Sequence, residues 1–302
     1  ETGLWLVQRP AGAVIHHLPY QGAYDWPAML GFLRARAIEG LEVVQGDTYA
    51  RTFALAGGQG ILSVCPGPAG HLQVQLQGAE QALLPQVLAR LRRQFDLDAD
   101  LSLINRHLAR DPLLAPLLAA RPGLRVPGAW DGFELAIRAV LGQQITVQGA
   151  IRLAGKLVAV HGRLLASPDP QWPGLTHLFP TPQVLSTANL ADLGMPRSRA
   201  RTLSAVAQAL LDDPLLFEPR ASLQQGVERL LQLPGIGDWT AQYIALRQLR
   251  ESDAFPAADV GLFNAVARLQ GLRPNARQLL ARAEAWRPWR GYAAQHLWAA
   301  MG

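Results

Sequence analysis

The sequence predicts an α+β protein in which a small N-terminal domain with an antiparallel sheet precedes a larger, all-helical body. Three observations support this prediction. The chain has 302 residues, which is too long for one small core. Short segments with alternating apolar residues stop near residue 100, and helical apolar spacing dominates after that point. We therefore place an N-terminal α+β domain at residues 1–110 and a helical domain at residues 111–302.

The predicted strands of the N-terminal domain are short segments in which apolar and polar residues alternate. They are Gly3–Val7, Val14–Leu18, Leu41–Gln45, Tyr49–Ala56, Ile61–Cys65 and Leu72–Leu76. A glycine-rich stretch predicts a hairpin between two of these strands, at Gly57, Gly58, Gln59 and Gly60. Helices are expected at Asp25–Ile38, with Asp25 as the N-cap, and at Glu80–Phe95.

The helical domain is predicted from apolar residues at helical spacing and from short connections that are rich in proline or glycine. The predicted helices are Asp131–Gln143, Val147–Val160, Pro182–Ala188, Arg199–Leu211, Leu223–Leu231, Thr240–Gln248, Val260–Leu269, Asn275–Ala285 and Tyr292–Ala300. A long loop is expected at Ser167–Pro182, where five prolines occur.

Composition and charge narrow the classes of protein that this chain can be. The net charge of +5 and the pI of about 10.0 suit a polyanionic partner, although many proteins of similar charge bind none. Cys65 is the only cysteine, which excludes disulfides, thiolate zinc sites and four-cysteine iron–sulfur clusters. No apolar run approaches the roughly 20 residues that span a bilayer, and no secretory signal is evident. We expect a cytoplasmic protein without a membrane partner, for which a monomer suffices.

The segment LPGIG at residues 233–237 joins two predicted helices into a helix-hairpin-helix at about residues 224–248. Its two glycines permit a tight turn and let a ligand approach the backbone. The amides would lie at the N-terminus of the second helix, where free N–H groups and the helix dipole favour an anion. A DNA phosphate is the expected anion, with contacts from Gly235, Ile236, Gly237 and Thr240. The alternative is an ordinary helix–helix turn closed by glycine.

Asp259 precedes the helix predicted at Val260–Leu269, and its simplest role is to cap that helix. A carboxylate that faces a cleft from a helix start can also stabilise the positive charge that grows on a sugar as a glycosidic bond breaks. It can equally orient or deprotonate an attacking water molecule. The two roles are compatible, because a cap position fixes the direction of the carboxylate.

Aromatic residues cluster near the C-terminus, at Trp286, Trp289, Tyr292 and Trp298, with Arg287 and Arg290 between them. In an ordinary helical protein most of these rings would belong to the core, which is the expectation for Trp286. An enzyme that processes a nucleobase, however, needs stacking surfaces for an extruded nucleotide. For an alkylated, cationic base such rings add a cation–π attraction of roughly 0.5–2 kcal/mol.

Several sequence runs, in order over nearly the whole chain, carry a resemblance to a known family. They are YDWPAMLGFLRARA, Phe133 with the segment 139–143, FPTPQ, LGMPRSRA, LPGIGDWTAQYIALR and AEAWRPWRGYAAQHLW. Together they resemble the AlkA-type 3-methyladenine DNA glycosylase II, within the helix-hairpin-helix glycosylases. The resemblance implies an N-terminal antiparallel α+β domain, two helical subdomains that flank a base-binding cleft, and double-stranded DNA with damaged bases as the partner.

Carried over by position, the resemblance makes Asp259 the catalytic carboxylate, twenty residues beyond Trp239 of the hairpin motif. It implies substrate binding by Trp239, Tyr243, Trp298 and Gln143. Related lyases have a Schiff-base lysine where this chain has Trp239, and the only lysine of the chain, Lys156, lies in a helical run without a site motif. Both observations favour simple hydrolysis without lyase activity.

The resemblance implies two finer features. A hairpin of this kind can bind a monovalent cation through backbone carbonyls, here those of Leu231, Leu233 and Ile236, and no other cofactor is expected. The family also has an apolar wedge that fills the gap left by a flipped base, and Gln144 holds that position here. A glutamine can occupy the gap and hydrogen-bond the orphaned base, but it stacks less well.

The leading hypothesis is a monofunctional DNA glycosylase that flips alkylated purines, such as 3-methyladenine and 7-methylguanine, out of duplex DNA and hydrolyses their N-glycosidic bond. This reaction begins base excision repair. Two alternatives stay open. A glycosylase for oxidised guanine would share the fold but would ordinarily carry the hairpin lysine. A non-enzymatic protein that binds damaged or branched DNA would keep the hairpin but leave Asp259 and the aromatic residues unexplained.

Overall fold

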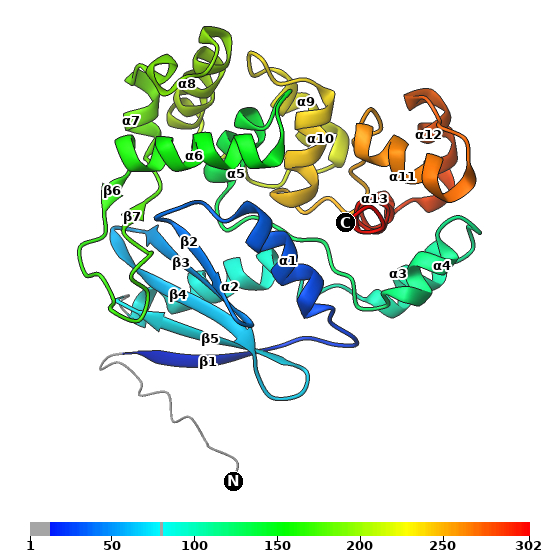
Figure 1. Cartoon of the computed structure of the whole chain (residues 1–302), viewed down its shortest axis with the longest axis horizontal. Helices are drawn as coiled ribbons and strands as arrows, with labels where there is room; N and C mark the ends of the chain where they lie inside the picture. The colour runs from blue at the N-terminus through cyan, green and yellow to red at the C-terminus, as the bar shows by residue number, and fades with distance from the viewer. Residues whose placement is uncertain (1–12, 79–80) are drawn as a thin grey trace.

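The structure is a computed structural model that describes residues 13–78 and 81–302. A five-stranded sheet with two helices forms one end of the molecule, and a helical body forms the other (Figure 1). The strand predicted at Gly3–Val7 lies outside the described residues. Among the helices that the structure describes, none has the length and apolar character needed to cross a membrane.

The sheet is antiparallel throughout, with the strand order β1-β5-β4-β3-β2. Its strands are β1 (Val14–Pro19), β2 (Glu42–Gln45), β3 (Thr48–Leu55), β4 (Gly58–Pro66) and β5 (His71–Gln77). Helices α1 (Trp26–Arg36) and α2 (Leu84–Gln94) pack on it, and the side chain of Asp25 caps α1 by accepting a hydrogen bond from the Ala28 amide at 3.0 Å. The predicted α+β class and these strands are confirmed.

The hairpin between β3 and β4 differs from its prediction. Leu55 pairs with Gly58, so the loop contains only Ala56 and Gly57, which both have positive φ angles of 48° and 82°. Such a two-residue turn matches the twist of the flanking strands. Gly60 belongs to β4, where a Cβ atom would lie 2.1 Å from the Gln77 carbonyl oxygen. The glycine run therefore serves close strand packing as well as the turn.

The helical body has one continuous apolar core, and every helix predicted there is present with small differences at its ends. The helices are α3 (Leu101–Leu108), α4 (Ala115–Ala120), α5 (Gly132–Leu141), α6 (Val147–His161), α7 (Pro182–Thr187), α8 (Arg197–Asp212), α9 (Leu223–Leu231), α10 (Asp238–Arg247), α11 (Val260–Gln270), α12 (Ala276–Ala283) and α13 (Arg290–Ala299). The sequence analysis missed α3 and α4. It also missed a short pairing between β6 (Arg163–Leu164) and β7 (His177–Leu178), which encloses the proline-rich loop.

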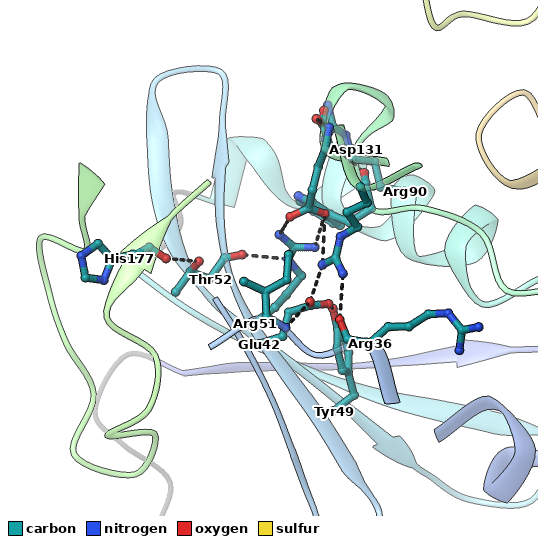
Figure 2. A network of polar contacts seen from close by, with 12 residues as sticks. Arg36, Glu42, Tyr49, Arg51, Thr52, Arg90, Asp131 and His177 are labelled. Atoms are coloured by element: carbon teal, nitrogen blue, oxygen red, sulfur yellow. Dashed lines mark hydrogen bonds and ion pairs between the residues drawn. The ribbon is translucent and has the colours of Figure 1, made fainter. Parts of the chain in front are cut away.

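A buried network of charged side chains joins the sheet domain to the helical body (Figure 2). Arg51 of β3 donates two hydrogen bonds to the carboxylate of Glu134 of α5, at 2.8 and 2.9 Å. Arg138, one turn further along α5, donates to the Glu42 carboxylate and to the Arg36 carbonyl. Burial alone would raise the pKa of Glu134, but the guanidinium groups of Arg51 and Arg138 outweigh it and lower the pKa. The network thus fixes α5 against the sheet domain.

Candidate active site

Asp259 is held by donors from three helices. As the N-cap of α11, its Oδ2 atom accepts a hydrogen bond from the Leu262 amide at 2.9 Å. The indole Nε1–H of Trp239, on α10, donates to Oδ1 at 2.8 Å, and that of Trp298, on α13, donates to Oδ2 at 2.8 Å. Hydrogen bonds to an ionised acceptor are stronger than neutral ones and fix its direction. The carboxylate is half-buried, so it is anchored on one side and open on the other.

Helix α10 supplies a column of side chains along one face, because residues four apart lie above one another on a helix. The rings of Trp239 and Tyr243 are stacked, with centroids 5.1 Å apart and planes inclined by 14°. Arg247, one further turn along, places its guanidinium carbon 4.9 Å from the Tyr243 ring centroid. The rings predicted to bind substrate therefore lie beside Asp259, together with a cation that the sequence analysis did not single out.

These groups line one cavity of about 650 Å³. The helical body contributes Asp259, Trp239, Tyr243 and Trp298, while Phe32 of α1 shows that the sheet domain lines the same cavity. A volume and apolar lining of this kind suit a small aromatic ligand. A second cavity, of about 790 Å³, lies around the ion pair of Asp111 with Arg282 and shares no lining residue with the first. We place the chemistry in the cavity that contains Asp259.

The electrostatic field of the cavity is positive around Tyr243. Burial raises the pKa of the Tyr243 hydroxyl, but the nearby guanidinium groups of Arg247, Arg36 and Arg138 outweigh that effect and lower the pKa below its ordinary value.

The predicted hairpin lies between α9 and α10, as expected for a helix-hairpin-helix. Gly235 has a φ angle of +78°, and a Cβ atom there would lie 2.2 Å from the Thr202 Oγ1 atom of α8. Gly237 has a φ angle of −91° and no heavy atom near its virtual Cβ. The Ile236 side chain is buried in the core, so only its backbone faces outward. A glycine is therefore required at position 235 by the positive φ angle of the turn and by its close contact with Thr202. At position 237 the structure has room for a Cβ atom.

The structure places Gln143 on the hairpin rather than among the residues that line the cavity. Its Nε2 amide donates to the Gly235 carbonyl at 3.2 Å and to the Thr240 hydroxyl at 3.1 Å. Arg199 of α8 donates to the backbone carbonyl of Gln143. Thr240 is buried, and its hydroxyl faces Gln143. The substrate-binding role that the resemblance implies for Gln143 stays a prediction; its contacts tie the loop after α5 to the hairpin, and Gly142 and Ile145 of the same loop line the cavity.

Gln144, at the predicted wedge position, is exposed and has a φ angle of +60°. A non-glycine residue in the left-handed region is uncommon and costs strain. The preceding residue is held by the hairpin contacts of Gln143, which explains how this conformation is maintained. Its side chain is exposed in the loop between α5 and α6.

The carbonyls of Leu231, Leu233 and Ile236 meet part of the requirement for a cation site. Within residues 13–78 and 81–302, the Leu231 and Ile236 carbonyls accept no hydrogen bond, whereas the Leu233 carbonyl accepts one from the Ile236 amide at 3.2 Å. Carbonyl oxygen is a suitable ligand for a hard cation. In the same described residues, no group of three histidine, cysteine or acidic side chains is arranged to hold a metal.

Of the aromatic residues near the C-terminus, only Trp298 lines the cavity. Trp286 is buried in the core, as expected, and donates a hydrogen bond to Asp111 at 2.7 Å. Tyr292 is also buried and donates to Asp96, while Trp289 packs on His107. Sequence reasoning missed two lining residues, Phe32 and Trp130. Phe32 lies in the run YDWPAMLGFLRARA and Trp130 precedes the Asp131 cap of α5, both far along the chain from the hairpin and Asp259, so local sequence does not place them at the cavity.

Comparisons with known proteins agree with this architecture. Residues 15–131 match the model of the AlkA N-terminal domain, and residues 137–291 match that of the HhH-GPD superfamily base excision DNA repair protein. A protein of Mycobacterium tuberculosis, named "Probable bifunctional transcriptional activator/DNA repair enzyme AlkA", is 39% identical over 96% of this chain. The chain spans 58% of the length of that relative.

A second relative, the "DNA-3-methyladenine glycosylase 2" of Escherichia coli, is 37% identical over 95% of this chain and 98% of its own length. Among solved structures, "3-methyladenine dna-glycosylase from Archaeoglobus fulgidus" superposes with a TM-score of 0.82 at 23% identity, covering 94% of this chain and 97% of that one. The structural likeness supports the fold. The family matches and the identity to these relatives show that the chain belongs to the HhH-GPD superfamily of base excision DNA repair proteins, within its AlkA-type 3-methyladenine DNA glycosylase II family.

Proposed function

We propose that this protein is a monofunctional DNA glycosylase that flips alkylated purines of the 3-methyladenine and 7-methylguanine type out of duplex DNA and hydrolyses their N-glycosidic bond. The observation that carries this proposal is the Asp259 carboxylate, held by two indole N–H groups and a helix amide beside stacked aromatic rings. The names of the relatives, among them the Escherichia coli protein that this chain matches over nearly its full length, agree with it. The product, an abasic site, is the starting point of base excision repair.

The carboxylate acts on the sugar. As the bond between C1′ and the base breaks, positive charge develops on the sugar ring, and the negative charge of Asp259 stabilises it. The same carboxylate orients a water molecule and takes its proton as the water oxygen bonds to C1′. Its three donors keep Asp259 in one orientation throughout, which avoids reorganisation during the step.

The reaction ends at hydrolysis because the only lysine of the chain is not placed to attack the sugar. Lys156 is exposed on α6 and is not among the residues that line the cavity. Trp239 occupies the place where a lyase of this superfamily carries its lysine, and its Nε1–H is bound to Asp259. Schiff-base formation by a lysine is therefore not part of the mechanism.

Duplex DNA is positioned on a phosphate by the backbone amides of Gly235, Gly237 and Asp238 at the N-terminus of α10, since the Ile236 amide already donates to the Leu233 carbonyl. Arg197 and Arg201 add exposed positive charge on the first turns of α8, the helix that touches the hairpin through Thr202. The carbonyls of Leu231, Leu233 and Ile236 would hold a monovalent cation, which supplies charge neutralisation near the phosphate. One chain contributes the carboxylate, the rings, the hairpin and the Gln144 wedge, so we propose that it acts as a monomer.

The proposal is tested by incubating the protein with duplex DNA that carries 7-methylguanine at one position. We expect release of the free methylated base and a strand that stays intact until it is treated with alkali. Strand breakage without alkali would revive the lyase alternative. Tight binding to lesion DNA without base release would support the non-enzymatic alternative, and release of oxidised guanine alone would support the other glycosylase specificity.

A further inference from the structure

Arg247 is a buried cation without a carboxylate partner at the back of the cavity. Only 3% of the residue is exposed, and its guanidinium donates to the Pro127 carbonyl at 2.8 Å and to the Gln295 side-chain oxygen at 3.3 Å. In the part of the chain that the structure describes, no acidic side chain forms an ion pair with it. Of the other arginines that line the cavity, Arg51 is buried and pairs with Glu134, and Arg138 is half-buried and pairs with Glu42. Arg36 is half-buried and donates to the Phe32 carbonyl, so Arg247 is the fully buried one that lacks a carboxylate among the described residues.

The uncompensated charge lies directly behind the aromatic rings of the cavity. The guanidinium carbon of Arg247 is 4.6 Å from the ring centroid of Phe32, 4.9 Å from that of Tyr243 and 5.5 Å from that of Trp298. Arg247 itself lines the cavity, so a base that stacks on these rings would lie close to its charge. Coulomb interactions are strong over such a distance in a site of low effective dielectric.

The charge on the leaving base differs between two classes of lesion. When the bond between C1′ and the base nitrogen breaks, both electrons move onto the base. A cationic N-alkylated purine therefore leaves as a neutral molecule, whereas a neutral damaged purine leaves as an anion that takes a proton from solvent afterwards. Water supplies the new C1′–O bond in both cases, and its proton passes to Asp259. Only the neutral class develops negative charge that a nearby cation can stabilise.

We propose that Arg247 is a specificity-determining residue, whose buried charge stabilises the negative charge on a neutral purine as it leaves and so extends excision from cationic to neutral lesions. This inference rests on the proposed glycosylase function. For a cationic lesion the same charge gives no such assistance, because negative charge does not accumulate on the base.

The surroundings of Arg247 agree with this assignment. The charge of Arg247, with those of Arg36 and Arg138, lowers the pKa of the Tyr243 hydroxyl although burial raises it, so these guanidinium groups act on a group in the cavity wall. Burial also lowers the pKa of Arg247 itself, as expected for a charge with few compensating groups. Burying a guanidinium group costs desolvation free energy, and no carboxylate offsets that cost at Arg247 among the described residues. A role for its positive charge in the reaction would explain why the charge is kept.

The test compares two lesions on the same protein. Single-turnover excision is measured for a neutral deaminated purine, hypoxanthine, and for cationic 7-methylguanine, each in the same duplex, with native protein, Arg247→Met and Arg247→Lys. We expect Arg247→Met to lower the hypoxanthine rate relative to the 7-methylguanine rate by roughly tenfold or more. Arg247→Lys keeps the charge and is expected to restore much of this ratio. Because both rates come from one preparation, loss of folded protein cancels in the ratio.

Arg250→Met is the matched control. Arg250 lies just beyond α10 and donates to the Val126 carbonyl and the Asp96 carboxylate, outside the cavity that contains Asp259. We expect this variant to keep the native ratio even if it is less stable. Equal loss of both activities in Arg247→Met, or a native protein that excises 7-methylguanine but no neutral purine, would overturn the inference and leave the proposed function intact. A native protein that excises neither lesion contradicts the proposed function itself.

Discussion

At the start of α11, the Asp259 carboxylate accepts one helix amide and the indole N–H groups of Trp239 and Trp298. A helix cap needs only the amide. Asp100, for example, caps α3 by accepting from the Leu103 amide at 3.2 Å. Two further donors from α10 and α13 are what distinguish Asp259. At the scale of single residues, the site is therefore a capping aspartate whose direction is fixed by two tryptophans.

Trp298→Phe removes one of these donors and keeps an aromatic ring in the cavity. We expect single-turnover excision to fall by about ten- to a hundredfold, because the carboxylate is less firmly oriented toward the sugar. Affinity for lesion DNA should change little, since the stacking surface remains.

The matched control is Trp286→Phe, which removes an indole hydrogen bond to Asp111 in the core, remote from the cavity. This variant should lose stability but keep the native rate per folded molecule. If Trp298→Phe excises at the native rate, the indole of Trp298 has no part in orienting Asp259.

At the scale of elements, the hairpin, the wedge loop and the start of α8 form one unit. Gly235 lies against Thr202 of α8, its carbonyl accepts from Gln143, and Gln143 precedes the wedge residue Gln144. Arg199 holds the same loop through the Gln143 carbonyl. The segment that we propose contacts a phosphate is thus connected to the segment that we propose enters the duplex, and these contacts would set their spacing before DNA binds.

Gly235→Ala tests this unit. The new Cβ atom would lie 2.2 Å from Thr202 Oγ1 at a φ angle of +78°, and a left-handed non-glycine residue alone costs about 1–3 kcal/mol. We expect a distorted hairpin and a loss of DNA affinity of roughly tenfold or more, equal for all sequences because the contact is to phosphate.

Gly237→Ala provides the comparison, because a Cβ atom at Gly237 meets no heavy atom within 4 Å and its φ angle is negative. DNA affinity measured by fluorescence anisotropy should stay close to native. The same loss in both variants would mean that the glycines act by leaving room for the DNA and not through the geometry of the turn.

Much of this could be predicted from the sequence, for identifiable reasons. Helices α5 to α13 have apolar residues at helical spacing and clear capping or proline signals, and each was predicted close to its observed bounds. Helix α3 also has a cap at Asp100 and buried Leu101, Ile104 and Leu108, but it is only two turns long, and so short a pattern is weak. Gly58–Gly60 looked like a loop because pairing partners across a sheet are not visible in local sequence.

The contacts of the candidate site could be predicted where they follow from the spacing of residues along one helix. Trp239 and Tyr243 stack because they are four residues apart on one helix. The contact of Gln143 with the hairpin was not predictable, because the two segments are 92 residues apart and meet only through tertiary packing. Arg247 follows the same four-residue spacing, and only its burial without an acidic partner, which the structure supplies, gives it significance.

At the scale of the whole molecule, the cavity is built by both domains and depends on the interface between them. Phe32 and Trp130 line it together with the rings of the helical body. The ion pair of Arg51 with Glu134 crosses this interface, and both side chains are at most 5% exposed. A buried ion pair of this kind contributes little net stability. Removing one partner is strongly destabilising, because the other charge stays buried without its compensation.

Arg51→Met removes both hydrogen bonds that Arg51 donates to the buried Glu134 carboxylate and leaves Arg138, 3.9 Å away, as its nearest ion-pair partner. We expect a loss of about 3 kcal/mol in the free energy of unfolding, measured by chemical denaturation. The double variant Arg51→Met with Glu134→Leu removes the under-compensated carboxylate and should recover much of this loss. A double variant as unstable as the sum of both single variants would show that the pair is not coupled across the interface.

The central claim, that Asp259 does more than cap α11, is tested most directly by comparing Asp259→Asn with Asp100→Asn. Asparagine caps a helix as well as aspartate does, so both variants should fold. In single-turnover excision of 7-methylguanine from a duplex, we expect Asp259→Asn to be slower than native protein by a hundredfold or more, as an order of magnitude, while its affinity for lesion DNA is retained. Asp100→Asn should keep the native rate. Native excision by Asp259→Asn, or equal losses in both variants, would contradict the account.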